Sequence, residues 1–272
     1  MKNNHWLLFL TFFCFTGITL LICGCAQNSG LSPSKIEESA RQDTLKVGIT
    51  PTDPPLVFRD HGKAIGLEVA FAKGLAQYTG KKLSLVELKW TEQIPALLDG
   101  KIDIIMSGMT ITEARKYQIN FCEPYMVTSQ ISLVRREDYN RFSEGFPALL
   151  NPVMKVGTVK GTTGDYLIEQ NRARGNRIQF NSANKAVLAL LDESIDVLVY
   201  DLPTNLYYGA QYSDKGLKPV IVPLTREYTA WAVHPGNTEI LNKANAYLQS
   251  MKDENTLVPM IEKWIPFYKN LL

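Results

Sequence analysis

The sequence has 272 residues, enough for one large domain or two small ones. Hydrophobic residues make up 45% of it and charged residues 21%, a balance typical of a packed globular protein. The formal net charge is +2, and no run of lysines and arginines forms a basic stripe, so the composition does not favour nucleic-acid binding. The histidines are scattered and no cysteine–histidine cluster has the spacing of metal ligands, so we expect neither a metal nor another cofactor.

The first 25 residues differ in kind from the rest of the chain. Lys2 precedes an apolar stretch from Trp6 to Ile22, and Cys23, Gly24 and Cys25 follow. A charged start, an apolar core and a small residue before a cysteine predict a secretory signal peptide over residues 1–25. The run resembles the lipobox of bacterial lipoproteins, in which Cys25 would be diacylated and become the new N-terminus. Cys23 is the weaker candidate because the bulky Ile22 precedes it.

An uncleaved membrane anchor is the alternative, because an apolar stretch of about 17 residues lies at the short end of what spans a bilayer. Both interpretations place the rest of the chain outside the cytoplasm, attached to the periplasmic or cell-surface face of a membrane. Residues 26–43 are polar, contain Ser, Gly and Pro, and are predicted to form a flexible tether. With Cys25 lipidated, Cys122 has no partner, so we expect no disulfide and a small apolar role for Cys122 inside the fold.

From residue 44 onward, strand-like and helix-like segments alternate. Short apolar runs predict buried strands, and apolar residues at helical spacing predict the helices between them. The expected strands lie at 45–50, 82–88, 102–107, 131–136, 155–161, 177–180, 195–201 and 217–224, and the expected helices at 66–80, 91–100, 163–173, 182–194 and 237–251. Repeated alternation of this kind predicts an α/β fold with layers of helices around parallel sheets.

The chain contains one internal repeat. Residues 96–108 and 189–201 share Ala, Leu, Leu, Asp, Ile and Asp at matching positions, so a helix, a tight turn and a buried strand recur in the same order. The repeat predicts two lobes of like architecture, each with its own sheet. Ligands of open α/β sheets bind outside the carboxyl ends of the strands. The repeated strands end near Gly108 and at Asp201, so we expect a cleft where these two ends face one another.

Small residues and one arginine follow the first of these strands. Ser107, Gly108 and Thr110 leave backbone polar groups open, and Arg115 comes five residues after Thr110 on a short segment begun by Thr112. A forked guanidinium can take both oxygens of a carboxylate, while the loop amides and the Thr110 hydroxyl take its remaining lone pairs. The alternative is a solvent-facing arginine on an ordinary helix.

Asp201 would complete the site from the opposite lobe. It can hold the α-ammonium of a free amino acid whose carboxylate lies at Arg115. Such a ligand makes all of its contacts only when the lobes close, so binding and closure become one event. The alternative for Asp201 is a helix N-cap before Leu202 and Pro203, because proline fits the first helical turn.

The spacing G-x-T-x-T-x-x-R at 108–115, followed by F-x-x-P-Y at 121–125, resembles the bacterial extracellular solute-binding proteins that capture amino acids for ABC importers. The likeness extends over residues 44–268. Further motifs that match are Pro54-Pro55-Leu56, Gly66-Leu67-Glu68-Val69, Val159 to Gly164, and Tyr200-Asp201 at the ammonium site.

The resemblance implies a two-lobed α/β fold of the periplasmic-binding-protein, or Venus flytrap, type. Each lobe would be a mostly parallel sheet flanked by helices, and two strand crossovers near 129–134 and 223–228 would form the hinge. Lobe 1 would comprise residues 44–131 and 227–272, and lobe 2 residues 132–226. The implied ligand-binding residues are Thr50, Asp53, Trp90, Gly108, Thr110, Arg115, Lys160, Thr163 and Asp201.

Several of these positions have specific expected roles. Thr163 should add hydroxyl and amide donors to the carboxylate at a helix N-terminus, and Trp90 should wall the ligand side chain. Thr50 and Asp53 depart from the family, which often has an acid and an aromatic residue there. Asp53 either points its charge into the pocket, favouring a donor-bearing or cationic side chain, or caps the turn before Pro54. Lys160 would repel a cation unless it points outward.

The resemblance implies a receptor that passes a polar amino acid to an ABC permease in the inner membrane. One alternative is an enzyme resembling cyclohexadienyl dehydratases, which need a proton donor over the leaving hydroxyl of a prephenate-like acid. Those enzymes carry a glutamate three residues past the lobe 2 aspartate, where this chain has Thr204; Glu68 and Glu123 are the remaining candidate acids. A third interpretation is a ligand-sensing subunit, which we expect to require a separate partner.

Overall fold

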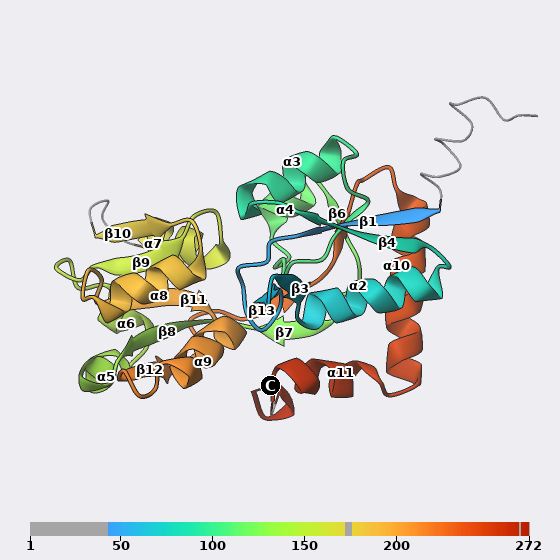
Figure 1. Cartoon of the computed structure of the whole chain (residues 1–272). Helices are drawn as coiled ribbons and strands as arrows, with labels where there is room; N and C mark the ends of the chain where they lie inside the picture. Colours follow the sequence, from blue (N-terminus) through green and yellow to red (C-terminus); the bar gives the residue numbers. More distant parts are fainter. Residues whose placement is uncertain (1–42, 172–175, 267, 272) are drawn as a thin grey trace, which may run out of the picture.

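The computed structural model describes residues 43–171, 176–266 and 268–271. These residues form two α/β lobes joined by a pair of crossover segments (Figure 1). The predicted signal peptide, Cys25 and residues 26–42 of the predicted tether lie outside the described residues. Within those that are described, no helix is both long and apolar enough to cross a membrane.

The sheet of lobe 1 has five strands in the order β4-β1-β5-β14-β6. Their bounds are β1 (Thr44–Ile49), β4 (Lys82–Glu87), β5 (Ile104–Ile105), β6 (Asn120–Phe121) and β14 (Ala232–Val233). β1 pairs in parallel with β4 and β5, whereas β14 runs antiparallel to β5 and β6. Because β14 returns from beyond lobe 2 in the sequence, lobe 1 is built from two separate stretches of chain.

The sheet of lobe 2 repeats this plan in the order β10-β9-β11-β8-β12. Its strands are β8 (Gln130–Arg135), β9 (Val156–Val159), β10 (Arg177–Phe180), β11 (Val197–Asp201) and β12 (Leu217–Val220). β9 pairs in parallel with β10 and β11, and β8 runs antiparallel to β11 and β12. The central strands, β5 and β11, come from the two repeated segments of the sequence, so the repeat occupies the same place in each sheet. The predicted two-lobed fold is confirmed.

Helices cover the sheets of both lobes (Figure 1). Those of lobe 1 are α2 (Leu67–Tyr78), α3 (Gln93–Leu98), α4 (Glu113–Lys116), α10 (Thr238–Asp253) and α11 (Leu257–Trp264). Those of lobe 2 are α5 (Tyr139–Phe142), α6 (Phe146–Leu149), α7 (Thr163–Asn171), α8 (Ala183–Leu191) and α9 (Leu202–Gln211). The remaining elements are the hairpin β2 (Phe58–Asp60) and β3 (Lys63–Ile65), and the short 3-10 helices η1 (Trp90–Glu92), η2 (Arg136–Asp138) and η3 (Tyr268–Leu271).

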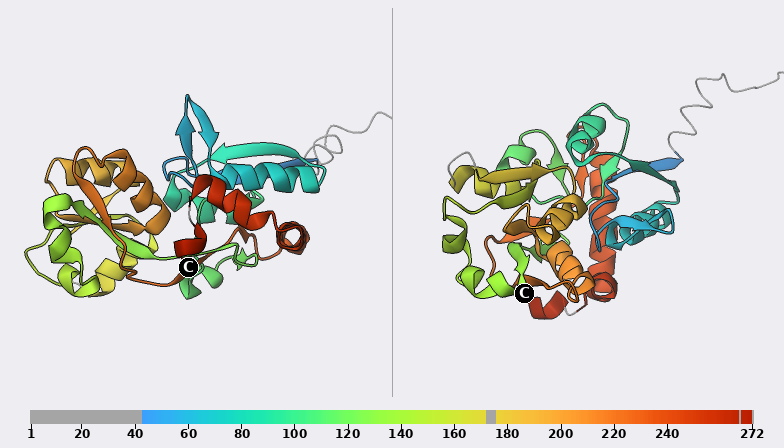
Figure 2. Two further views of the ribbon diagram at one scale, coloured as in Figure 1. Left: turned by 90° about the horizontal axis from the view of Figure 1, so that it is seen from below. Right: turned by 60° about the vertical axis from the view of Figure 1, so that its left-hand side comes forward.

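The lobes are connected by two crossovers that lie side by side (Figure 2). β7 (Met126–Thr128) pairs antiparallel with β13 (Glu227–Thr229). Beyond this pair, the Gln130 N–H donates to the Thr225 hydroxyl at 2.9 Å, and the Leu224 N–H donates to the Gln130 carbonyl at 2.9 Å. Strand pairing of lobe 2 therefore begins at Gln130, slightly before the boundary at residue 132 that the sequence predicts.

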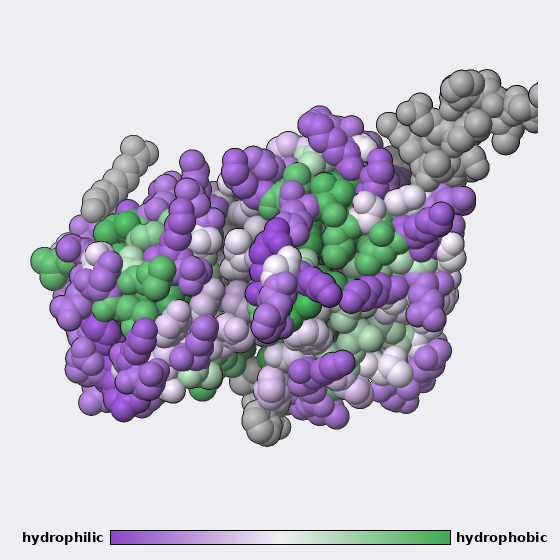
Figure 3. Space-filling model, in the orientation of Figure 1, coloured by the Kyte–Doolittle hydropathy of each residue, from purple (hydrophilic) through white to green (hydrophobic). Residues whose placement is uncertain are grey.

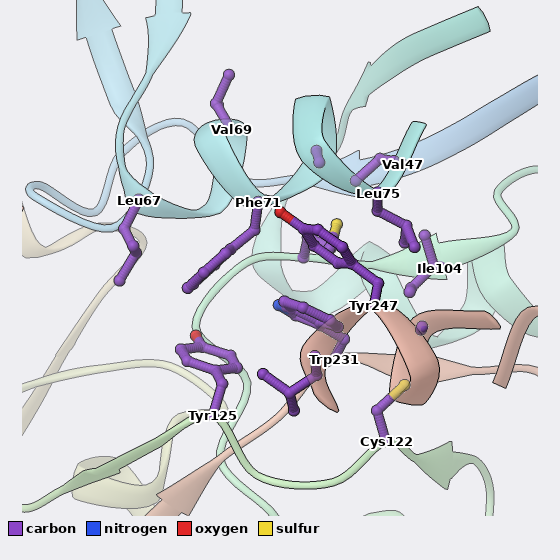
Figure 4. Packing of buried hydrophobic residues seen from close by; sticks show 14 of the residues in the cluster. Val47, Leu67, Val69, Phe71, Leu75, Ile104, Cys122, Tyr125, Trp231 and Tyr247 are labelled. Carbon is purple, nitrogen blue, oxygen red and sulfur yellow. The ribbon is translucent and has the colours of Figure 1, made fainter. Parts of the chain in front are cut away.

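The core of lobe 1 is built around an aromatic cluster (Figure 4). The ring centroids of Phe71 and Trp231 lie 5.3 Å apart, and those of Tyr125 and Trp231 lie 5.6 Å apart. Cys122 is a free, buried thiol in the same core, in the apolar role expected for it. Outside the core, hydrophilic residues cover most of the face seen in Figure 3, and hydrophobic residues gather in smaller areas on each lobe.

A carboxylate, Glu68, is buried within this core. It accepts hydrogen bonds from the Tyr125 hydroxyl at 2.6 Å, from the Trp231 indole N–H at 3.2 Å and from the Gly108 N–H. Burial raises the pKa of Glu68 from 4.5 to about 7, although these three donors lower it. Glu68 thus fixes the backbone at the end of β5 from beneath, but it is fully buried and does not face the cleft.

We predict that Glu68 makes the protein more stable in mild acid. Its pKa in the folded state is raised above the unfolded value, so its contribution is fully present below pH 4.5 and is lost as the pH rises through about 7. A shift of this size corresponds to about 3 kcal/mol. Urea unfolding on both sides of this pH window should show a loss of stability that is smaller by about this amount in Glu68→Gln than in the wild type, because the raised pKa values of Asp53 and Asp201 remain in both. The exposed Glu254→Gln is the control, and an unchanged pH dependence in Glu68→Gln would contradict the prediction.

Candidate functional site

The loop after β1 brings Asp53 into the space between the lobes. Its backbone is fixed by two hydrogen bonds with Val57, both 2.8 Å long. Its side chain is buried, and Oδ1 accepts from the Thr204 hydroxyl of lobe 2 at 2.6 Å. Burial raises the pKa of Asp53 to about 6, although hydrogen bonds from Thr204 and Tyr200 lower it. The side chain therefore faces the cleft and contacts the opposite lobe.

Thr50, which directly follows β1, is held within lobe 1. Its N–H donates to the Ser107 hydroxyl at 2.9 Å, and its hydroxyl accepts from the Gln93 amide at 2.9 Å. The first contact ties the end of β1 to the end of β5. Gly108 follows with φ of +69°, in the left-handed region that favours glycine, and a Cβ there would lie 2.7 Å from Leu56 Cδ1. The ends of β1 and β5 therefore pack closely together, and the Gly108 N–H, expected to be open to a ligand, donates to Glu68 instead.

Arg115 lies on α4 and is buried, so the solvent-facing alternative does not apply. The Thr112 hydroxyl caps this short helix by accepting from the Arg115 N–H at 3.3 Å. The guanidinium donates to the Thr110 carbonyl at 2.7 Å and across the cleft to the Gly161 carbonyl at 3.3 Å. It also lies over the Trp90 ring, 5.2 Å from the centroid. Burial lowers the pKa of Arg115 and Asp201 acts against this, but an arginine stays protonated in proteins.

Gly161 carries the lobe 2 loop that meets this arginine. The Trp90 indole N–H also donates to its carbonyl, at 2.9 Å, so two side chains of lobe 1 converge on one oxygen of lobe 2. The Gly161 φ of +77° again requires the left-handed region. Behind the loop, Asp165 accepts from the Gly161 N–H at 3.0 Å and from the Thr158 hydroxyl at 2.7 Å, which sets the position of the carbonyl.

Asp201 ends β11 and stands at the N-cap position of α9, but its side chain makes no capping hydrogen bond. Instead it accepts from the Gln130 amide. Burial, followed by the charges of Asp53 and Glu227, raises the pKa of Asp201 well above its ordinary value, while Arg115 and Gln130 lower it. The carboxylate is therefore directed into the cleft, where it is one of several neighbouring acids.

Glu227, which the sequence analysis did not identify, connects both lobes to the hinge. Its Oε2 accepts from the Thr110 hydroxyl of lobe 1 and the Thr163 hydroxyl of lobe 2, both at 2.9 Å, and from the Gln130 amide at 3.3 Å. Its Oε1 accepts from the Thr225 hydroxyl at 2.9 Å. The Glu227 side chain is buried, so this carboxylate is satisfied almost entirely by protein donors.

The contacts of Glu227 alter the expected roles of two threonines. A hydroxyl has a single proton to donate, and the protons of Thr110 and Thr163 both go to Glu227. The sequence predicts that these two hydroxyls donate to the ligand carboxylate. In this arrangement they can only accept hydrogen bonds from a ligand. Of the side chains predicted to bind the carboxylate, the Arg115 guanidinium remains a donor.

Two small cavities lie between these groups. One, of about 10 Å3, is lined by Asp53, Trp90, Ser107, Gly108, Thr110, Arg115, Thr162, Thr163, Tyr200 and Asp201. The other, of about 20 Å3, is lined by Thr50, Thr52, Asp53, Trp90, Ser107, Val159, Asn181, Ser182 and Tyr200. Every predicted site residue except Lys160 lines one of them; the Lys160 side chain is exposed and lines neither.

A wider cleft of about 770 Å3 opens beyond Arg115, between α3 and α7. It shares Trp90, Arg115 and Thr163 with the smaller cavity and reaches Glu227 near the hinge. A space of about 10 Å3 holds roughly one water molecule. An amino acid can therefore reach the groups around Arg115 and Asp201 only when the lobes move apart.

We predict that Glu227 stabilises the closed arrangement of the lobes. Glu227→Ala would leave Thr110, Thr163 and Gln130 without their shared acceptor, at a cost of about 1–3 kcal/mol for buried donors. Distances between spin labels on α3 and α7, measured by electron paramagnetic resonance, should shift toward larger values in this variant. The exposed Glu254→Ala should leave them unchanged, and identical distributions in Glu227→Ala and wild type would refute the role.

Residues 45–267 match the family of bacterial extracellular solute-binding proteins, family 3, and the chain belongs to this family. The L-cystine-binding protein TcyJ of Escherichia coli (strain K12) is 27% identical over 247 residues, which are 90% of this chain and 91% of TcyJ.

Solved structures show the same architecture. A putative binding component of an ABC transporter from Wolinella succinogenes DSM 1740, complexed with lysine, aligns with a TM-score of 0.77 and 30% identity, over 84% of this chain and 98% of that one. An ancestral amino acid-binding protein, a precursor of cyclohexadienyl dehydratase, aligns with a TM-score of 0.76 and 32% identity, over 85% and 99%.

Proposed function

We propose that this protein captures a free, polar amino acid between its lobes and delivers it to an ABC permease in the inner membrane. Family membership supports the proposal, as do relatives that bind cystine, lysine or other amino acids. The observation that carries it is the placement of Arg115 and Asp201. They approach one small cavity from opposite lobes, with opposite charges.

The two charges suit the two ends of an amino acid. The Arg115 guanidinium supplies donors for the α-carboxylate. Asp201 and the acceptor hydroxyls of Thr110 and Thr163 suit the α-ammonium, which carries only donors. A ligand that bridges the lobes gains both sets of contacts on closure, which couples binding to the movement at the hinge.

We predict that both ends of this clamp are required for binding. Arg115→Ala or Asp201→Ala leaves a desolvated ligand charge without its partner, which costs about 2–5 kcal/mol and weakens binding at least roughly thirtyfold. Calorimetry should use the amino acid that gives the largest thermal stabilisation in a screen of the standard amino acids. Lys116→Ala and Asp99→Ala, exposed changes of the same charge, are the controls. Near-normal affinity in both clamp variants would place the site elsewhere.

The enzymatic alternative lacks support from the cleft. The position three residues past Asp201 holds Thr204, whose hydroxyl donates to Asp53 and carries no acid. Glu68 is enclosed in the lobe 1 core, and Glu123 is exposed and lines neither small cavity. We therefore favour binding over dehydration, and we expect no turnover of prephenate or arogenate; turnover by the wild type that Arg115→Ala abolishes would reverse this choice.

We further propose that the protein is anchored to a membrane through a lipid on Cys25, a proposal based on the sequence Ile22-Cys23-Gly24-Cys25 after the apolar stretch. Cys25→Ser should abolish incorporation of labelled palmitate in cells and release the protein from the membrane fraction or leave it unprocessed. Cys23→Ser is the matched control and should keep the label. Retained labelling in Cys25→Ser, or loss of the label in Cys23→Ser, would contradict the assignment.

A further inference from the structure

More acidic than basic side chains line the cleft. Asp53 and Asp201 line the cavity that Arg115 also lines, and Glu227 lines the wider cleft next to it. With all four ionised, their formal charge is −2. Among the described residues that line these cavities, Arg115 is the only cation. An amino acid with a neutral side chain has no net charge and leaves this excess unchanged.

The three acids are not equally available to a ligand. Glu227 already accepts four hydrogen bonds from protein groups. Asp201 is the partner proposed for the α-ammonium. Asp53 remains: its Oδ1 accepts from Thr204, and hydrogen bonds from neutral hydroxyls do not neutralise its charge. Removing an ionised carboxylate from water is costly unless a cation accompanies it. The acid that needs a cationic partner is therefore Asp53.

Asp53 also stands at the junction of the two small cavities, because it lines both of them. The first cavity contains the clamp of Arg115 and Asp201. The second contains neutral polar groups, from Thr50, Thr52, Asn181 and Ser182, and of the described residues that line it Asp53 alone is charged. Trp90 lines both cavities and can cover an aliphatic stem that runs from one to the other.

We propose that the ligand is a short-chain diamino acid of the size of 2,3-diaminopropionate, 2,4-diaminobutyrate or ornithine. This inference rests on the proposed amino-acid function. The α-ammonium of the ligand lies at Asp201, and its side-chain ammonium lies at Asp53. An ammonium is a compact charge whose attraction to a carboxylate weakens with distance. Because Asp53 lines the same small cavity as Arg115 and Asp201, a short side chain reaches it, whereas the longer side chains of lysine and arginine would place their charge among the neutral groups of the second cavity.

The test is calorimetry on the full chain with a graded series: the three short diamino acids, lysine, arginine, and the neutral analogues citrulline and glutamine. In the wild type, the best short diamino acid should bind at least roughly thirtyfold more tightly than citrulline or glutamine, and more tightly than lysine or arginine. Asp53→Asn should bring the diamino and neutral ligands to within about threefold, a difference below 1 kcal/mol. Asp60→Asn, the same change on the exposed β2–β3 hairpin, should match the wild type.

Other outcomes distinguish failure of the Asp53 assignment from failure of the proposed amino-acid function. Tightest binding of lysine or arginine, or equal affinity for citrulline and ornithine in the wild type, overturns the assignment of Asp53 while the clamp stands. An unchanged preference in Asp53→Asn, with a thermal unfolding curve like that of the wild type, overturns it as well. If no amino acid in the series or among the standard amino acids binds the wild type, the proposed function itself fails.

Discussion

Like charges buried together between two lobes dominate this structure. Asp53, Asp201 and Glu227 come from separate stretches of chain and meet around a single arginine. Each accepts hydrogen bonds from neutral groups. Asp53 accepts from Thr204 and Tyr200, and Asp201 accepts from Gln130. Glu227 accepts from three threonines and from Gln130. Without those donors, burial of the carboxylates would oppose closure of the lobes. The hydroxyl-rich lining of the cleft is therefore a consequence of its charges.

Two residues that hydrogen-bond within the cluster of acids, Gln130 and Glu227, belong to the crossover segments that form the hinge. Gln130 is the first residue of β8 and Glu227 the first residue of β13, so each crossover contributes a side chain at the point where it meets a lobe. Glu227 contacts Thr110 in one lobe and Thr163 in the other. A rotation about the crossovers must change at least one of these distances. Opening of the cleft therefore breaks at least one of these hydrogen bonds and exposes the groups that made it to water.

Local patterns predicted the parts of this arrangement that depend on neighbouring residues. The repeat at 96–108 and 189–201 predicted two equivalent sheets, and the fold confirms them. The buried position of Arg115 beside the Thr110 carbonyl follows from a spacing of five residues. The strand predicted at 102–107 is assigned only over Ile104–Ile105, although the Asp103 and Met106 N–H groups also donate to β1, at the Lys46 and Gly48 carbonyls.

Features that depend on distant pairing could not be predicted in this way. Gln130 and Glu227 are 97 residues apart, and the hydrogen bonds between the two crossovers bring them together. A weak signal was present, since Glu227 begins EYTAWAV, a segment otherwise free of charge. The direction of the Thr110 hydroxyl could not be predicted without Glu227. Lys160 matched a family position by spacing, but it directly follows the buried Val159 and its own side chain is exposed.

The contact between Asp53 and Thr204 shows how one carboxylate can serve both closure and recognition. A carboxylate offers about four lone-pair sites, and the Thr204 hydroxyl occupies one of them. A cationic group of a ligand can therefore bind Asp53 while the contact between the lobes is kept. A glutamate at position 204 would bring a further negative charge to this carboxylate and compete with it for the same cation. The Thr204 hydroxyl thus leaves Asp53 free to bind a cationic group of the ligand. Because Thr204 and Asp53 come from opposite lobes, this hydrogen bond forms only when the lobes are closed.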